Sequence, residues 1–259
     1  MKNDLVSNEE IKALFPGIHT TNEFPAIEVV KTPLPAFNDI VLGCGGIPRG
    51  RTIELYSAPS AGKTTLSVNL CHWYIKQGFR AIWDDREGTF PDENYTKGIG
   101  LDRDALTQVH TGSGNDSLYQ FEIMAALNIA DLWVIDSLAM LHPFGASTVK
   151  DTENQSMHDK LARASMLTGF FQRLRSGFYI GKPGTCRKDG TYAQKDKIES
   201  DVVYYKEGKE DKYWHKLSDK KITLIMVNHM KTRPGIRYGD KTSTPGGDAT
   251  KFDSSIRLR

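Results

Sequence analysis

Residues 54–65 read Glu-Leu-Tyr-Ser-Ala-Pro-Ser-Ala-Gly-Lys-Thr-Thr, and this stretch decides the fold. Its first residues predict an apolar strand, and the pattern from Leu66 to Ile75 predicts a helix. Between the two lies a loop of small residues that ends in Gly-Lys-Thr-Thr. A strand, such a loop and a helix, in this order, are the context of a phosphate-binding P-loop.

The parts of this loop suit a polyphosphate. Small residues let backbone N–H groups close around the phosphates, and the helix N-terminus adds a partial positive charge. Lys63 can reach the terminal phosphates, and the Thr64 hydroxyl can hold Mg²⁺. The residues that we expect to contact the nucleotide are Ser57, Ala58, Pro59, Ser60, Ala61, Gly62, Lys63, Thr64 and Thr65.

One position departs from the usual loop, because Ser57 stands where the first glycine normally does. If that position needs a positive φ, a serine there is strained. The alternative interpretation is an ordinary strand-turn-helix with a chance Gly-Lys-Thr. The flanking strand and helix fall where the motif demands them, and this favours the P-loop.

Composition limits the function classes only loosely. The 259 residues suit one large domain or two small ones, and the formal net charge is +2 with 25% charged residues. Nucleic-acid binding must therefore come from local patches rather than from the overall charge. The N-terminus lacks an apolar signal segment, and no apolar run approaches the roughly 20 residues that span a bilayer, so we expect a cytoplasmic protein without a membrane partner.

The chain divides into an N-terminal arm, residues 1–30, and a core, residues 31–259. In the arm, Ser7 to Glu10 has capping-box spacing and predicts a short helix through Phe15. Inside the core, residues from about 177 to 220 are charged and carry tyrosines. We interpret that stretch as an insertion of hairpins or loops.

Apolar strands recur along the core at residues 80–85, 131–137 and 222–229, with helical patterns between them. Near-continuous apolar runs separated by helices indicate a parallel sheet that is buried on both faces. We therefore expect an α/β fold with a mostly parallel central sheet and helices on both faces. In such sheets, ligands lie at the carboxyl ends of the strands.

Acidic residues lie at or just past these strand ends. Asp136 is the natural Walker-B acid, which would hold Mg²⁺, although an aspartate that only caps its strand is the alternative. Glu87 is the best candidate to orient or deprotonate the attacking water. Asp84, Asp85 and Asp92 compete for that role, and the residues alone leave the choice close to even.

The end of the last apolar strand carries His229, which could contact a γ-phosphate and move the loop after it. A histidine with a purely structural role is the alternative. The following segment, residues 231–247, is rich in basic, hydroxyl and glycine residues, which suit a phosphodiester backbone. An ordinary solvated loop would have a similar composition.

Together these residues resemble the core ATPase of the RecA/UvsX strand-exchange recombinases, from about Val30 to Arg259. The most specific part, Asn228 to Phe252, looks like the family's switch residue, second DNA-binding loop and Gly-Gly-x-Ala-x-Lys-Phe ending. Leu132 to Ser137 matches the Walker-B strand, and Asp85-Arg86-Glu87 is similar to the family's Asp-x-Glu. The resemblance implies a RecA-like P-loop NTPase core with ATP and Mg²⁺ as cofactors.

The resemblance also implies roles for individual residues. It makes Glu87 the catalytic base and His229 the γ-phosphate sensor, since the phage-type branch also carries histidine there, and with Lys63 they form the implied catalytic set. Asp92 and Tyr95 fall where the family contacts adenine. The residues implied to contact DNA are Arg163, Lys231, Arg233, Arg237, Gly246 and Gly247.

The function that follows is a DNA-dependent ATPase that forms filaments on single-stranded DNA in recombination and repair. One alternative is a RecA-fold mediator or motor, and another is a non-hydrolysing module that modulates filaments. The chain stops at Arg259, where the family continues with lysines that reach the neighbouring subunit's ATP. We therefore expect a fragment or a short paralogue, and the insertion is a second departure from the family.

Overall fold

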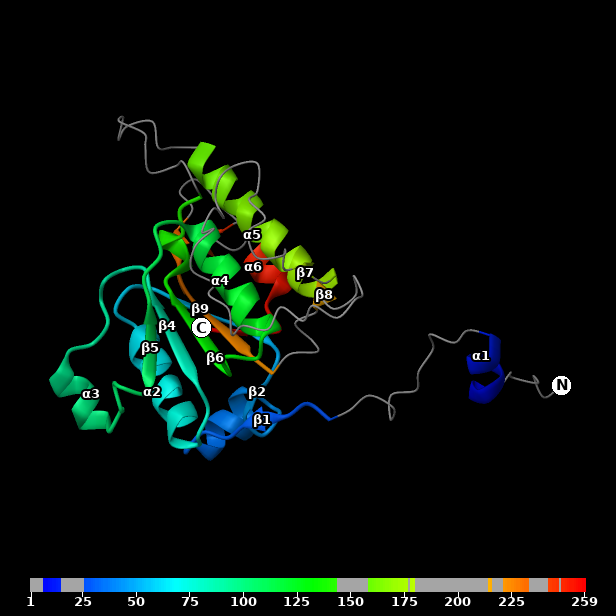
Figure 1. Ribbon diagram of the computed structural model, residues 1–259, viewed down its shortest axis with the longest axis horizontal. Coiled ribbons are helices and arrows are strands. Elements are labelled where there is room, and N and C mark those ends of the chain that lie inside the picture. The colour runs from blue at the N-terminus through cyan, green and yellow to red at the C-terminus, as the bar shows by residue number, and fades with distance from the viewer. Residues whose placement is uncertain are drawn as a thin grey trace.

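The computed structural model describes residues 7–14, 26–143, 158–176, 178–179, 214–215, 221–232, 242–246 and 248–259. Its centre is a six-stranded sheet in which all neighbouring strands are parallel. The strands, in order across the sheet, are β12 (Ile256–Leu258), β3 (Thr52–Ser57), β9 (Thr223–His229), β6 (Leu132–Asp136), β4 (Ala81–Asp85) and β5 (Leu106–Val109). The predicted α/β class is confirmed (Figure 1).

Helices cover both faces of this sheet. Helix α2 (Lys63–Lys76) packs on one face, and α4 (Gly114–Ala126) and α5 (His158–Ser176) pack on the other (Figure 1). Strand β6 contributes to the cores on both faces. Leu132 and Val134 join the core beneath α2, whereas Trp133 and Ile135 join the core beneath α4 and α5. Successive side chains of a strand point to opposite faces, so a strand with two covered faces is apolar throughout.

Shorter elements surround the sheet. Three helices are α1 (Asn8–Leu14), α3 (Glu93–Ile99) and α6 (Asp248–Asp253), and two short helical turns are η2 (Phe37–Val41) and η3 (Leu138–Met140). The helix predicted in the N-terminal arm is α1, which Figure 1 shows apart from the sheet. None of the helices in the described ranges is long and apolar enough to cross a membrane.

Three antiparallel pairs complete the described structure. They are β1 (Val29–Val30) with β2 (Ile47–Pro48), β7 (Phe178–Tyr179) with β8 (Trp214–His215), and β10 (Lys231–Thr232) with β11 (Thr242–Ser243). Strands β7 and β8 are the only residues of the predicted insertion that the structure describes, and the remainder of residues 177–220 lies outside the described ranges.

A buried carboxylate joins three strands of the sheet. Glu54 on β3 has no exposed side-chain surface, and its two oxygens accept hydrogen bonds from Arg257 Nε on β12 (2.5 Å) and Asn228 Nδ2 on β9 (2.8 Å). A buried charge is costly unless it is paired and hydrogen-bonded. The guanidinium of Arg257 therefore balances the charge of Glu54 and links the edge strand to β3.

We predict that Arg257→Met, which keeps most of the aliphatic stem, lowers the free energy of unfolding by about 3 kcal/mol, because it leaves a buried charge without its counter-ion. Urea unfolding measures the change. Lys97→Ala is the control, since its ion pair with Glu93 is exposed on both sides and should contribute under about 0.5 kcal/mol. Equal unfolding midpoints for the two variants would contradict the assignment.

Candidate nucleotide site

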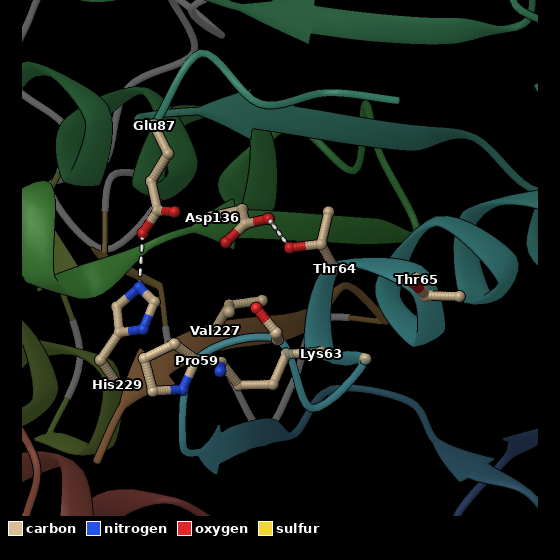
Figure 2. A pocket seen from close by; sticks show the side chains of 10 residues that line it. Pro59, Lys63, Thr64, Thr65, Glu87, Asp136, Val227 and His229 are labelled. Atoms are coloured by element: carbon tan, nitrogen blue, oxygen red, sulfur yellow. Dashed lines mark hydrogen bonds and ion pairs between the residues drawn. The ribbon is translucent and has the colours of Figure 1, made fainter. Parts of the chain in front are cut away.

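A cavity of about 410 Å³ opens at the carboxyl ends of β3, β6 and β9 and beside the turn after β4. Figure 2 shows side chains from these separate segments pointing toward one space. The lining residues are Pro59, Ser60, Gly62, Lys63, Thr64, Thr65, Glu87, Asp136, Val227 and His229. The structure thus brings together Glu87, Asp136, His229 and six of the nine predicted loop residues, whereas Ser57, Ala58 and Ala61 do not line the cavity.

The loop leads into α2 through a backbone conformation that only glycine adopts without strain. Gly62 is the N-cap of α2 with φ 88°, and Ser60 has φ 60°. Ser57 ends β3 in register with His229 and is not among the described residues with positive φ. The positive φ that would strain a serine therefore occurs at Ser60 and not at Ser57, because Ser57 still belongs to the strand and the chain turns only after it.

Lys63 begins α2 and folds back over the loop. Its Nζ donates to the carbonyl of Ala58 (2.9 Å), to the carbonyl of Ser57 (3.3 Å) and to Ser57 Oγ (3.2 Å). Burial lowers the pKa of Lys63, and the carboxylates of Asp136 and Glu87 oppose that shift. The ammonium is thereby held at the cavity wall, where an anion would meet it.

Thr64 and Asp136 form the part of the cavity that suits a cation. Thr64 Oγ1 donates to Asp136 Oδ2 at 2.7 Å (Figure 2), while Asp136 Oδ1 is buried without a hydrogen-bond partner among the described residues. Burial raises the pKa of Asp136 to about 6, the charges of Glu87 and Asp85 add to that rise, and the Thr64 bond opposes it. A hydroxyl beside a carboxylate oxygen without a partner is a donor set that fits Mg²⁺.

No group of three or more histidine, cysteine or acidic side chains that could hold a metal occurs among the described residues. Mg²⁺ commonly uses one or two protein oxygens and completes its shell with phosphate oxygens and water. Thr64 and Asp136 are therefore sufficient for a magnesium ion that arrives with a nucleotide.

Glu87 follows β4 by two residues and faces the cavity between two donors. Its Oε1 accepts hydrogen bonds from the Ser137 hydroxyl and from His229 Nε2, the latter at 2.6 Å (Figure 2). Burial alone would raise the pKa of Glu87, but these bonds, with the charges of His229 and Lys63, outweigh burial and lower it. Glu87 is thus ionised near neutral pH and able to accept a proton or orient a water.

The competing acids lie elsewhere. Asp84 is fully buried and accepts a hydrogen bond from Ser117 of α4, on the face opposite α2. Asp85 accepts from the backbone N–H groups of Gly88 (2.8 Å) and Phe90 (3.2 Å) and so closes the turn after β4. Neither lines the cavity.

The two predicted adenine contacts lie beside α2. Asp92 is the N-cap of α3 and accepts from the backbone N–H of Tyr95 (2.8 Å). The Tyr95 hydroxyl lies 3.2 Å from Asn69 Nδ2, on the helix that begins at Lys63. Neither Asp92 nor Tyr95 lines the cavity, so the structure places Tyr95 next to α2 and both residues outside the cavity.

The residues predicted to contact DNA are only partly described. Arg163 on α5 donates from Nε to the Leu141 carbonyl (2.8 Å), Lys231 on β10 is exposed, and Gly246 is buried with φ 100°. Arg233, Arg237 and Gly247 lie outside the described residues. None of the three described residues lines the cavity.

Sequence reasoning missed two connections. Ser137 holds Glu87, and its position directly after Asp136, the predicted metal ligand, was the available signal. Asn228 Nδ2 also donates to the Pro245 carbonyl (3.0 Å), which joins the end of β9 to the residue before Gly246. That second link joins segments that are distant in sequence, and no local pattern indicated it.

Comparisons with known proteins place this geometry in a family context. A model of the RecA N-terminal domain matches residues 19–174. The chain is 30% identical over 237 residues to Protein RecA of Fusobacterium nucleatum, covering 91% of this chain and 51% of that protein. It is 29% identical over 237 residues to Protein RecA of Oceanobacillus iheyensis, covering 92% and 55%. The chain therefore spans about half the length of these curated relatives.

We predict that Asp136→Asn stabilises the protein at pH 8 but not at pH 4. The pKa of Asp136 rises to about 6 in the folded state, so folding favours the neutral form, and stability is lost as the pH rises from about 4 to 6. Asparagine removes that cost, which amounts to about 3 kcal/mol for a shift of roughly two pKa units. Urea unfolding at several pH values measures the effect. A gain that does not change with pH would contradict this explanation.

Proposed function

Since this chain belongs to the RecA family, we propose that it binds and hydrolyses ATP as the core of a DNA-dependent recombinase. The observation that carries the proposal is the convergence of four segments on one cavity. Lys63 and Thr64 come from the start of α2, Glu87 from the turn after β4, Asp136 from β6 and His229 from β9. An anion-binding loop with acids and a histidine facing it suits a nucleoside triphosphate.

In the proposed complex, the backbone N–H groups of residues 60–65 and the Lys63 ammonium hold the phosphates. Thr64 and Asp136 hold Mg²⁺, and the buried Asp136 Oδ1 supports this assignment because it is otherwise unpartnered among the described residues. The ion supplies charge neutralisation between the phosphates. Asp92 and Tyr95, beside α2, are assigned to the adenine.

Glu87 is assigned to the attacking water. Ser137 and His229 both donate to Oε1, so we assign the second oxygen, Oε2, to the water. The lowered pKa keeps Glu87 ionised, which suits a carboxylate that orients the water by accepting a hydrogen bond from it. The two donors restrict the side chain to one orientation, and orientation is a large part of catalysis by a general base.

We assign His229 to contacting the γ-phosphate, so that the conformation of residues 231–247 depends on whether that phosphate is bound. Two hydrogen bonds support this link. Met230 N donates to the Ser57 carbonyl (2.9 Å), and the Asn228 side chain donates to the Pro245 carbonyl. We assign contacts with the phosphates of single-stranded DNA to Arg163, Lys231, Arg233, Arg237, Gly246 and Gly247. Further copies of the chain would join it in a cytoplasmic filament on that strand, and sequence would be read by base pairing.

The ATPase assignment predicts two different defects. Lys63→Ala should abolish measurable ATP binding, because it removes the charge at the cavity wall. Glu87→Gln should keep ATP binding but lower turnover by about 10²- to 10³-fold, since it removes a base and not a binding group. Calorimetry measures binding, and phosphate release with and without single-stranded DNA measures turnover.

Lys76→Ala, at the exposed far end of the same helix, is the matched control and should change neither property. Unchanged turnover in Glu87→Gln would refute its role. DNA binding by the unmodified chain without any turnover would instead favour the non-hydrolysing module, and turnover without filaments in electron micrographs would favour a mediator or motor.

The DNA assignment predicts a strong salt dependence. Contacts with phosphates release counter-ions, so the logarithm of the affinity for single-stranded DNA should fall linearly with the logarithm of salt concentration. Lys231→Ala should reduce the slope by about 0.7, the contribution of one phosphate contact in a single strand. Fluorescence anisotropy with an oligonucleotide measures the slope. Lys97→Ala, an exposed lysine on α3, is the control, and an equal change in both variants would contradict the assignment of Lys231.

A further inference from the structure

Arg86 stands between Asp85 and Glu87, yet its side chain is only 9% exposed and does not line the cavity. Its guanidinium points instead toward the connection between β5 and α4. Nη1 donates to the Thr111 carbonyl (2.8 Å), and Nη2 donates to the Ser113 carbonyl (3.2 Å) and to the Thr111 hydroxyl. Ser113 is the N-cap of α4, so Arg86 ties the turn after β4 to the start of that helix.

The backbone of the same turn is tied on its other side. The N–H groups of Arg86 (2.7 Å) and Glu87 (3.2 Å) both donate to the carbonyl of Asp136, at the end of β6. The turn that carries Glu87 is therefore held from two directions, by β6 through its backbone and by the β5–α4 connection through Arg86. Without the Arg86 tether, the backbone of this turn is held by β6 and by the Asp85 bonds inside the turn, but no longer by the β5–α4 connection.

Arg86 also faces a buried charge. Its Nε lies 2.8 Å from Asp84 Oδ1, and Asp84 has no exposed side-chain surface. Burial raises the pKa of Asp84, and the positive charge of Arg86 is the main effect that opposes the rise. A lysine could balance this charge, but only the planar fork of an arginine can pair with Asp84 while it donates hydrogen bonds to Thr111 and Ser113.

We propose that Arg86 is a positioning residue, whose guanidinium ties the turn after β4 to the N-cap of α4 and thereby aims Glu87 at the cavity. The inference rests on the proposed function, because the aimed carboxylate is the one assigned to the attacking water. A purely structural Arg86 would stabilise the fold without affecting the position of Glu87.

The first test needs no turnover. Amide hydrogen exchange in the nucleotide-free full chain should be at least tenfold faster in Arg86→Lys at residues 86 and 87, whose N–H groups bond Asp136, and unchanged in the centre of β6. Arg80→Lys is the matched control, because Arg80 precedes the same strand at its opposite end and is exposed. It should leave exchange at both residues unchanged.

The second test separates positioning from binding. Arg86→Lys should lower kcat for ATP at least tenfold while the Kd for ATP stays within twofold, since Arg86 does not reach the cavity. Added to Glu87→Gln, it should lower kcat no further, because a residue that acts only through Glu87 has no effect once Glu87 is gone. If Arg86→Lys does not fold, the double variant Asp84→Asn/Arg86→Gln removes both charges and takes its place.

Unchanged hydrogen exchange at residues 86 and 87 overturns the proposal, whatever the value of kcat. A loss of kcat that adds to that of Glu87→Gln also overturns it. An unmodified chain that does not hydrolyse ATP refutes the proposed function, and in that case hydrogen exchange alone decides whether Arg86 positions the turn.

Discussion

Asp136 holds the site together through both its side chain and its backbone. Its Oδ2 accepts the hydroxyl of Thr64 from the loop helix, and its carbonyl accepts the N–H groups of Arg86 and Glu87. The end of one central strand therefore positions both Thr64, at the start of α2, and the turn that carries Glu87. This works because β6 lies next to β4 and β9, whose carboxyl ends meet it at one edge of the sheet.

The two acids of the cavity differ in pKa because their surroundings differ. Burial and neighbouring carboxylates raise the pKa of Asp136, whereas hydrogen bonds from Ser137 and His229 overcome burial and lower that of Glu87. Environments that shift the pKa values of two carboxyl groups in opposite directions allow the groups to take different roles. Glu87 is ionised and can accept a hydrogen bond, whereas ionising the buried Asp136 costs free energy that a bound cation would offset.

Much of the fold and part of the site could be predicted from the sequence. Strands β4, β6 and β9 fall within two residues of the apolar runs that predicted them, because a strand covered on both faces must be apolar throughout. Strands β5 and β12 were missed, since Leu106–Val109 has two exposed residues and Ile256–Leu258 only three residues in all. The residues around Glu87 could not separate it from Asp84 and Asp85, because all three follow or end the same strand.

The sequence by itself determined the order of strand, loop and helix around Lys63 and the acids at the strand ends, because these depend on local periodicity and on the steric freedom of small residues. Only the tertiary structure decided which acid faces the cavity, and it buried Arg86 against the start of α4. Nothing local marks a charged residue between two acids as buried. Its partners, Thr111 and Ser113, come from another part of the chain and reach it only when parallel strands align and α4 packs on the sheet.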